Sequence, residues 1–142
     1  MNQQDIKIVI YSSKTDSHFK KILDAIPISF PKKQINQYRT LDKFSNAVRN
    51  LLFGYGVIVI VVRHKQELDN IIQINGRLKD HSVILILEDT VEDLTSTALH
   101  LYPRYTGYIK EDYRDIHLVL EKMINKIENK LKRESKWQKI SI

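Results

Sequence analysis

Short runs of apolar residues alternate along this chain with longer stretches in which apolar residues recur every third or fourth position. The short runs have the length and β-branched content of strands, and the longer stretches have the periodicity of amphipathic helices. The predicted strands are Ile6 to Tyr11, Gln34 to Arg39, Val57 to Val62, Val83 to Leu87 and Tyr105 to Ile109. The predicted helices are His18 to Ile26, Leu41 to Leu52, Lys65 to Leu78, Val91 to Tyr102 and Tyr113 to Glu134.

Two of the predicted strands carry no polar residue. Val57 to Val62 and Val83 to Leu87 are apolar at every position, which is typical of strands buried on both faces of a parallel sheet. Gln34 to Arg39 is polar, as expected of an edge strand. Strands that alternate with helices over short connections favour a sheet covered on both sides. We therefore expect an α/β fold, a three-layer α/β/α sandwich around a five-stranded parallel sheet of order 2-1-3-4-5, with an extended C-terminal helix.

The composition is that of an ordinary globular domain. The chain has 142 residues, of which 42% are apolar and 28% charged, and this length is enough to bury a hydrophobic core. It has no cysteine, which excludes disulfides, thiolate nucleophiles and zinc sites built on sulfur. No segment approaches the roughly 20 apolar residues of a membrane span, and the start of the chain lacks the apolar run of a signal peptide. We expect a cytoplasmic protein.

Positive charge is concentrated at the end of the chain. The net charge is +6; residues 1–121 contain 16 Lys and Arg against 15 Asp and Glu, whereas residues 122–142 contain 7 against 2. We therefore divide the chain into a nearly neutral domain at residues 1–131 and a basic C-terminal tail at 132–142. Contact of the tail with an anion, with nucleic acid or with an anionic membrane surface is an alternative function. Because Glu128 and Glu134 interrupt the basic residues, nucleic-acid binding is not the expectation.

The last predicted strand ends in Gly107-Tyr108-Ile109-Lys110. This run, together with the order and spacing of the elements over residues 5–127, resembles the receiver domain of response regulators, the CheY-like domains. The resemblance implies a flavodoxin-like fold and a role in signal transduction. It also implies that Lys110 stands where receivers have a lysine that closes over the phosphorylation site.

The positions that carry out phosphoryl transfer in receivers hold other residues here. Receivers have an acidic pair after the first strand, which holds Mg²⁺, and an aspartate at the end of the third strand, which accepts the phosphoryl group. The acidic pair would fall at Ser12 and Ser13, and the acceptor at Val61 or Val62. Hydroxyls do not replace the carboxylates that neutralise a divalent cation, and valine has no nucleophile. The resemblance therefore implies a degenerate pseudo-receiver without catalytic residues, cofactor or metal.

Two further positions complete this degenerate site. The hydroxyl that receivers place after the fourth strand would fall near Glu88, whose carboxylate would repel a phosphoryl group. Lys110 is the one member of the receiver constellation that is retained. It either lies on the surface at the strand end or pairs with Glu88 or Asp89, and such a pair would hold the following loop in one state.

Loops at the same edge of the sheet leave other interpretations open. Ser12-Ser13-Lys14-Thr15 is similar to the hydroxyl-rich loop that binds the flavin phosphate in flavodoxins, although no glycine lets the backbone approach a phosphate closely. Asp16 or Ser17 is the expected N-cap of the next helix. Acidic residues after the fourth strand either hold a cation or cap and stabilise the following helix; they are Glu88, Asp89, Glu92 and Asp93.

The last predicted helix is longer than is needed to cover the sheet. From Tyr113 to Glu134 it would measure about 33 Å, so its second half must protrude, pair with another chain or fray. Its near-heptad apolar residues and the nearby tyrosines favour pairing. The candidate interface comprises Tyr102, Tyr105, Tyr108, Tyr113, Ile116, Leu120, Met123 and Ile127.

We expect a phosphorylation-independent signalling or protein-interaction module, not an enzyme. Its partner would be another protein or a second copy, bound through the fourth helix, fifth strand and fifth helix.

Overall fold

The protein contains a five-stranded parallel sheet. The structure is a computed structural model that describes residues 6–51, 55–88, 97–109 and 113–140, with side chains as far as Ser135. The strands run in the order β2-β1-β3-β4-β5, and every neighbouring pair is parallel. This confirms the predicted flavodoxin-like strand order. The strands are β1 (Lys7–Tyr11), β2 (Ile35–Tyr38), β3 (Gly56–Val62), β4 (Ser82–Leu87) and β5 (Tyr105–Tyr108).

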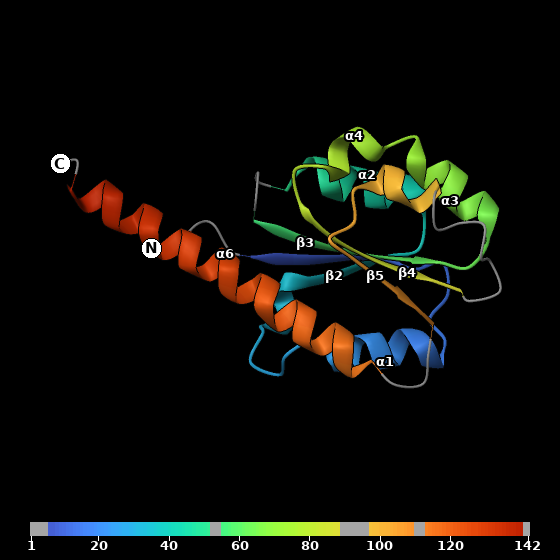
Figure 1. Ribbon diagram of the computed structural model, residues 1–142, viewed down its shortest axis with the longest axis horizontal. Coiled ribbons are helices and arrows are strands. Elements are labelled where there is room, and N and C mark those ends of the chain that lie inside the picture. Colours follow the sequence, from blue (N-terminus) through green and yellow to red (C-terminus); the bar gives the residue numbers. More distant parts are fainter. Residues whose placement is uncertain (1–5, 52–54, 89–96, 110–112, 141–142) are drawn as a thin grey trace.

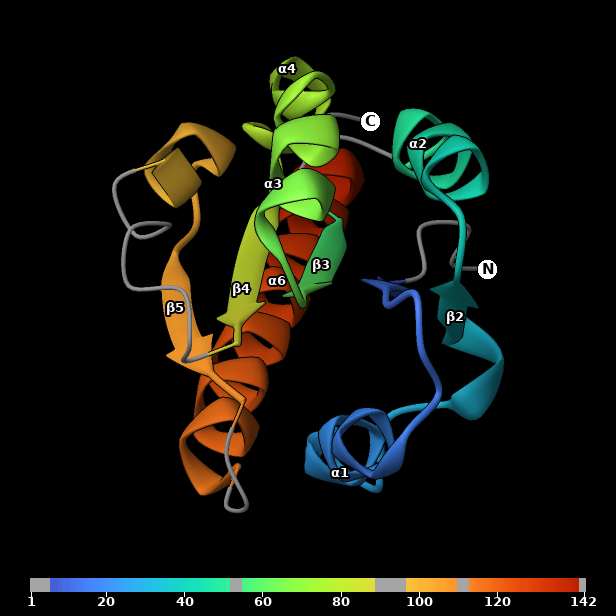
Figure 2. The ribbon, with the colours of Figure 1, turned by 90° about the vertical axis from the view of Figure 1, so that its right-hand side faces the viewer.

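Helices cover both faces of the sheet, which gives the three predicted layers (Figures 1 and 2). One face carries α1 (Ser17–Ala25) and α6 (Arg114–Ile140). The other face carries three helices and a short 3₁₀ turn; these are α2 (Leu41–Arg49), α3 (Lys65–Ile72), α4 (Asn75–Leu78) and η2 (Leu99–Leu101). A second 3₁₀ turn, η1 (Lys32–Gln34), leads into β2.

The central strand β3 contributes to two separate hydrophobic clusters. Val57, Val59 and Val61 belong to the cluster beneath α1 and α6. Ile58, Ile60 and Val62 belong to the cluster beneath α2, α3 and α4. Successive side chains of a strand point to opposite faces of the sheet. Because both faces are covered, all seven residues of β3 are buried, and this explains the absence of a polar position.

Two predicted helices differ from the observed ones. The stretch from Lys65 to Leu78 is divided, because α3 ends at Ile72 and α4 begins at Asn75. The break falls at Gln73 and Ile74, where Ile74 has a non-helical backbone (φ −107°, ψ 17°). Asn75 then begins α4, and its side chain donates to the His100 carbonyl at 3.2 Å. The helix predicted from Val91 to Tyr102 is described only from residue 97, and its first part lies outside the described residues. It ends in η2 and in Tyr102, which has a left-handed backbone (φ 55°) before Pro103.

The C-terminal helix α6 is longer than the sequence predicts. It runs without a break from Arg114 to Ile140, about 40 Å, so the basic segment 132–140 belongs to this helix. Because it follows β5 and runs back along the sheet, its far end passes the amino ends of the strands (Figure 1). Within the described part of the chain, none of the helices combines the length and the apolar character needed to cross a membrane.

Candidate functional site

The candidate site lies where the parallel strands end, at the carboxyl edge of the sheet. In α/β sheets the loops at this edge form ligand sites. The backbone amide of Ser12 donates to the Tyr38 carbonyl at 3.1 Å, and that of Glu88 donates to the Val62 carbonyl at 3.0 Å. These hydrogen bonds join the end of β1 to that of β2, and the end of β3 to that of β4. Residues 12, 62 and 88 thus lie on one edge of the sheet.

The two candidate positions for the phosphoryl acceptor carry no carboxylate. Val61 and Val62 are fully buried and point into the two hydrophobic clusters. Ser12 is also fully buried, Ser13 is half-buried, and Glu88 is half-buried at the end of β4. Lys110, the one retained member of the receiver constellation, lies outside the described residues. Its pairing with Glu88 or Asp89 stays a prediction.

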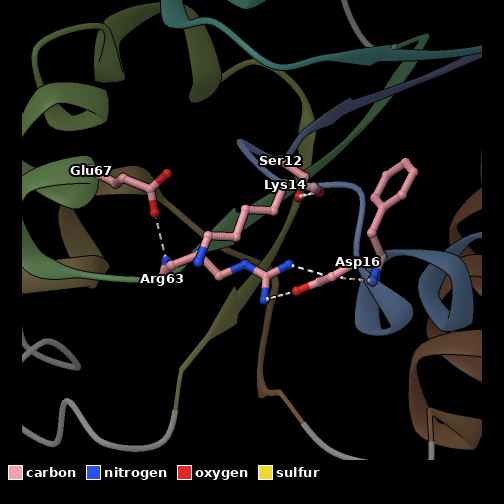
Figure 3. Close-up of polar contacts among 6 residues, drawn as sticks. Ser12, Lys14, Asp16, Arg63 and Glu67 are labelled. Carbon is pink, nitrogen blue, oxygen red and sulfur yellow. Dashed lines mark hydrogen bonds and ion pairs between the residues drawn. The ribbon is translucent and has the colours of Figure 1, made fainter.

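Arg63 is the main charged group at this edge. It directly follows β3, and its side chain is only 7% exposed. The guanidinium makes two contacts with the Asp16 carboxylate in the loop after β1: Nη1 lies 2.9 Å from Oδ2, and Nη2 donates to Oδ1 at 2.9 Å (Figure 3). This two-point geometry is the strongest form of the arginine–carboxylate pair. A fixed cation therefore joins the ends of β1 and β3.

Asp16 is also the N-cap of α1. Its Oδ1 accepts a hydrogen bond of 3.0 Å from the backbone amide of Phe19, which confirms one of the two residues predicted for this cap. Burial alone would raise the pKa of Asp16. The hydrogen bonds from Arg63 and Phe19, together with the charge of Arg63, outweigh that effect and lower the pKa. Asp16 is therefore ionised at neutral pH.

Glu67 orients the backbone on the other side of Arg63. This buried glutamate lies in the first turn of α3, and its Oε1 accepts a hydrogen bond of 2.7 Å from the Arg63 amide (Figure 3). The backbone amide of Glu67 in turn donates to His64 Nδ1 at 3.4 Å. Burial and the negative charge of Glu67 raise the pKa of Tyr11, which lies on the neighbouring strand. Two carboxylates thus hold Arg63, one at the side chain and one at the backbone.

The loop after β1 does not present a phosphate-binding geometry. The Ser12 hydroxyl is buried and donates to the Lys14 carbonyl at 2.7 Å, so it is used inside the loop. The Asp16 carboxylate occupies the first turn of α1, where a flavin phosphate would need the amides. Lys14 is exposed, and its side chain extends across the edge in the direction of Arg63 (Figure 3). The flavodoxin-like alternative gains no support from this arrangement.

A metal centre is not apparent in the described part of this edge. Among the residues that the structure describes, no group of three or more histidines and carboxylates is placed to hold a metal ion. Asp16 and Glu67 both contact Arg63, and Glu88 is half-buried at the end of β4. Three of the four acidic residues considered after β4, namely Asp89, Glu92 and Asp93, lie outside the described residues.

The predicted interface residues fall into two groups. Ile116, Leu120 and Ile127 point into the hydrophobic cluster under α6, where Tyr113 is also buried and Met123 is partly buried. They fill the core of a single chain because α6 uses its apolar side to cover the sheet, so they do not form an exposed surface. Tyr102 is 52% exposed, and Tyr105 and Tyr108 are half-buried on the edge strand β5. The exposed part of the predicted interface is therefore limited to the surroundings of β5.

The comparisons with known proteins return no relative. No protein-family model, no curated protein and no solved structure matches this chain. The fold assignment therefore depends on the strand order, the parallel pairing and the helices on both faces. The functional assignment depends on the geometry of the carboxyl edge, where Arg63 and Asp16 form a partly buried ion pair.

Proposed function

We propose that this chain is a receiver-like protein-interaction module that works without phosphorylation. The observation that carries the proposal is the partly buried ion pair between Arg63 and Asp16 at the carboxyl edge. It stands beside Val61 and Val62, where a receiver would need its acceptor carboxylate. In this proposal the module has the fold of a receiver, and the ion pair between Arg63 and Asp16 holds the loops after β3 and β1 together.

Electrostatics explains why this edge would not work as a phosphorylation site. Phosphoryl transfer to a receiver needs a carboxylate nucleophile and a divalent cation held by anionic oxygens. Here the cation is a guanidinium, which stays protonated and is already neutralised by Asp16. A divalent ion placed beside Arg63 would be repelled by it, and Asp16 could serve that ion only by releasing Arg63. The loops after β1 and β3 are thus held in one state.

A phosphorylation assay tests whether this chain accepts a phosphoryl group. Purified protein is incubated with a small-molecule phosphodonor and Mg²⁺, and its intact mass is measured. We expect no change in mass, while a phosphorylatable receiver domain treated in parallel gains a phosphoryl group. A phosphoryl group found on this chain under the same conditions would overturn the proposal.

The proposed partner surface surrounds the edge strand β5. Leu99 and Tyr102, in η2 and directly after it, are 64% and 52% exposed. Large apolar side chains left exposed near each other often mark a protein interface. β5 itself is an edge strand of the described sheet, with Tyr105 and Tyr108 half-buried on it. A second copy of the chain is the first partner to test.

Light scattering at increasing concentration measures the association directly. We expect the wild-type mass to approach twice the chain mass of 16.8 kDa. Leu99→Glu should remain monomeric because it places a charge in the contact. Ile28→Glu is the matched control, since Ile28 is fully exposed in the loop after α1 and away from β5. A wild type that stays monomeric would reject the homodimer, and the mass experiment would still decide the phosphorylation part.

A further inference from the structure

Helix α6 carries a stripe of basic residues. Lys122, Lys126, Lys130 and Arg133 are spaced by four, four and three positions. At 3.6 residues per turn, this spacing places all four on one side of the helix, within an arc of roughly 80°. Lys122, Lys126 and Arg133 are exposed, and Lys130 is partly buried. We call these four residues the basic stripe.

Three acidic residues near the basic stripe lie elsewhere on the helix, whereas Asp115, exposed in the first turn of α6, shares the stripe's side but precedes Lys122 by about 10 Å. Glu121 and Glu128 are exposed, but at 3.6 residues per turn they project roughly 140° away from the centre of the basic stripe. Glu134 accepts a hydrogen bond from the Tyr55 hydroxyl, so its carboxylate is turned toward the domain. The charges that interrupt the basic run in the sequence therefore do not interrupt it on the surface.

Tyr55 holds the far half of α6 against the domain. The tyrosine directly precedes β3 and is buried, and besides its contact with Glu134 its ring centroid lies 5.3 Å from the Lys130 ammonium. Ile127 is buried in the cluster under α6, and Leu131 packs against that cluster. The basic stripe is thus fixed on a rigid helix that passes the amino ends of the strands (Figure 1). It lies away from the carboxyl edge with Arg63, so it can be tested independently of the proposed function.

We propose that the basic stripe binds the phosphate backbone of double-stranded nucleic acid. Arg133 lies eleven positions after Lys122, which is about 17 Å along a helix. A duplex presents one phosphate per 3.4 Å of axis on each strand, so this length faces about five phosphates of one strand. Lysine and arginine on an exposed helix neutralise such phosphates without reading the base sequence. The stripe therefore fits a sequence-independent polyanion contact.

An anionic membrane is the other polyanion to consider, and the helix does not suit it. A helix that lies on a membrane inserts its apolar face among the lipids. The apolar face of α6 is already used, because Ile116, Leu120 and Ile124 are buried in the protein's own core. Between the basic and acidic sides lie the exposed Asn125 and Asn129, and Leu118, about one turn before the stripe, is 54% exposed. One exposed leucine does not provide the apolar face that insertion among lipids requires. The geometry therefore favours nucleic acid.

The experiment measures binding to a labelled duplex of arbitrary sequence by fluorescence anisotropy at several salt concentrations. We expect the logarithm of the association constant to fall with the logarithm of salt concentration with a slope of about −3, for three to four neutralised phosphates. The double variant Lys122→Gln/Lys126→Gln should bind about 50-fold more weakly near ~0.1 M salt, and its slope should be shallower by about 2. Glutamine forms helices well, so circular dichroism should show an unchanged fold.

The matched control removes the same charge from the opposite face. Lys65 and Lys79 are exposed beside α3 and α4, and Lys65→Gln/Lys79→Gln should bind the duplex like the wild type. Three results would overturn the proposal: no duplex binding by the wild type at low salt, equal weakening in the two double variants, or binding to anionic phospholipid vesicles without binding to the duplex.

Discussion

Arg63 and Asp16 differ in how much they depend on each other. The Arg63 side chain is 7% exposed, whereas that of Asp16 is 35% exposed. A guanidinium does not lose its proton in a protein, so Arg63 keeps its charge when its partner is removed. Loss of Asp16 therefore leaves a buried, uncompensated cation. Loss of Arg63 leaves a carboxylate that water already reaches in part.

Replacing Asp16 by asparagine tests this buried charge. The free energy of unfolding should fall by about 2 kcal/mol, less than the roughly 3–5 kcal/mol for a fully buried pair, because solvent screens Asp16 in part. Asparagine remains a good N-cap, whereas Asp16→Ala also removes the cap and should cost about 1 kcal/mol more. Urea denaturation at neutral pH measures all three proteins. An asparagine variant as stable as the wild type would show that the pair contributes nothing to stability.

His81 makes stability depend on pH near neutrality. Burial lowers its pKa, although the nearby Asp80 acts in the opposite direction. In an unfolded chain the pKa of histidine is about 6.5. Between that value and the lower folded pKa, the unfolded state binds a proton that the folded state does not. The free energy of unfolding should therefore decrease as pH falls from 7 toward 5.

The His81→Gln variant should lose part of this pH dependence, because glutamine does not titrate. Denaturation at pH 7.5, 6.5 and 5.5 measures the slope for each protein. His100→Gln is the matched control, since it removes a histidine that is exposed. A wild-type slope that His81→Gln leaves unchanged would assign the pH dependence to other groups.

Part of the carboxyl edge could be predicted from single residues, and part could not. The N-cap at Asp16 follows from local sequence and is confirmed. The serines after β1 and the valines at the end of β3 are read directly from the sequence. The Arg63–Asp16 pair joins residues 47 positions apart, and its geometry depends on how two loops approach each other. A signal was present: Arg63 is the first charged residue after a fully apolar strand, and Asp16 lies in a loop at the same edge.

Whole elements were more predictable than their ends. β3 and β4 are recognisable because burial on both faces removes every polar position from their interiors. The edge strand β2 is half-buried at every position, so its polar sequence left its limits uncertain by a residue at each end. The far half of α6 was predicted to protrude, pair or fray. Its docking could not be predicted, because it depends on Tyr55, which lies 79 residues before Glu134.

Tyr55→Phe isolates the contact that holds the end of α6. Phenylalanine keeps the ring in the core and beneath Lys130 but removes the hydroxyl that donates to Glu134. Stability should fall by about 1 kcal/mol, and the backbone amides around residues 128–135 should exchange with solvent faster. Glu128→Gln is the control because Glu128 is exposed on the same helix. Unchanged exchange in Tyr55→Phe would show that apolar packing alone holds this segment.

In the molecule as a whole, the two edges at which the strands begin and end carry different contacts, just as the two faces of the sheet carry different clusters. The carboxyl edge carries the Arg63–Asp16 pair, and the amino edge carries Tyr55 with the end of α6. Each of these contacts joins segments that are distant in the sequence, and each lies at an end of β3. Because β3 also supplies side chains to both hydrophobic clusters, changes on either face or at either edge should affect the same strand.

This arrangement predicts a single cooperative unfolding transition. Ile22 is fully buried in the cluster under α1 and α6, and Leu68 is fully buried in the cluster under α3. Substitution of either residue by alanine should lower the free energy of unfolding by roughly 2–5 kcal/mol, because each leaves a cavity against a central strand. Leu118→Ala is the control; Leu118 is more than half exposed, and its loss should change stability by about 0.5 kcal/mol or less.

Circular dichroism and hydrogen exchange should report coincident transitions in both core variants, since losing one cluster uncovers one face of β3 and β4. Two separate transitions in Ile22→Ala or Leu68→Ala would show that the two layers fold independently and that β3 does not couple them.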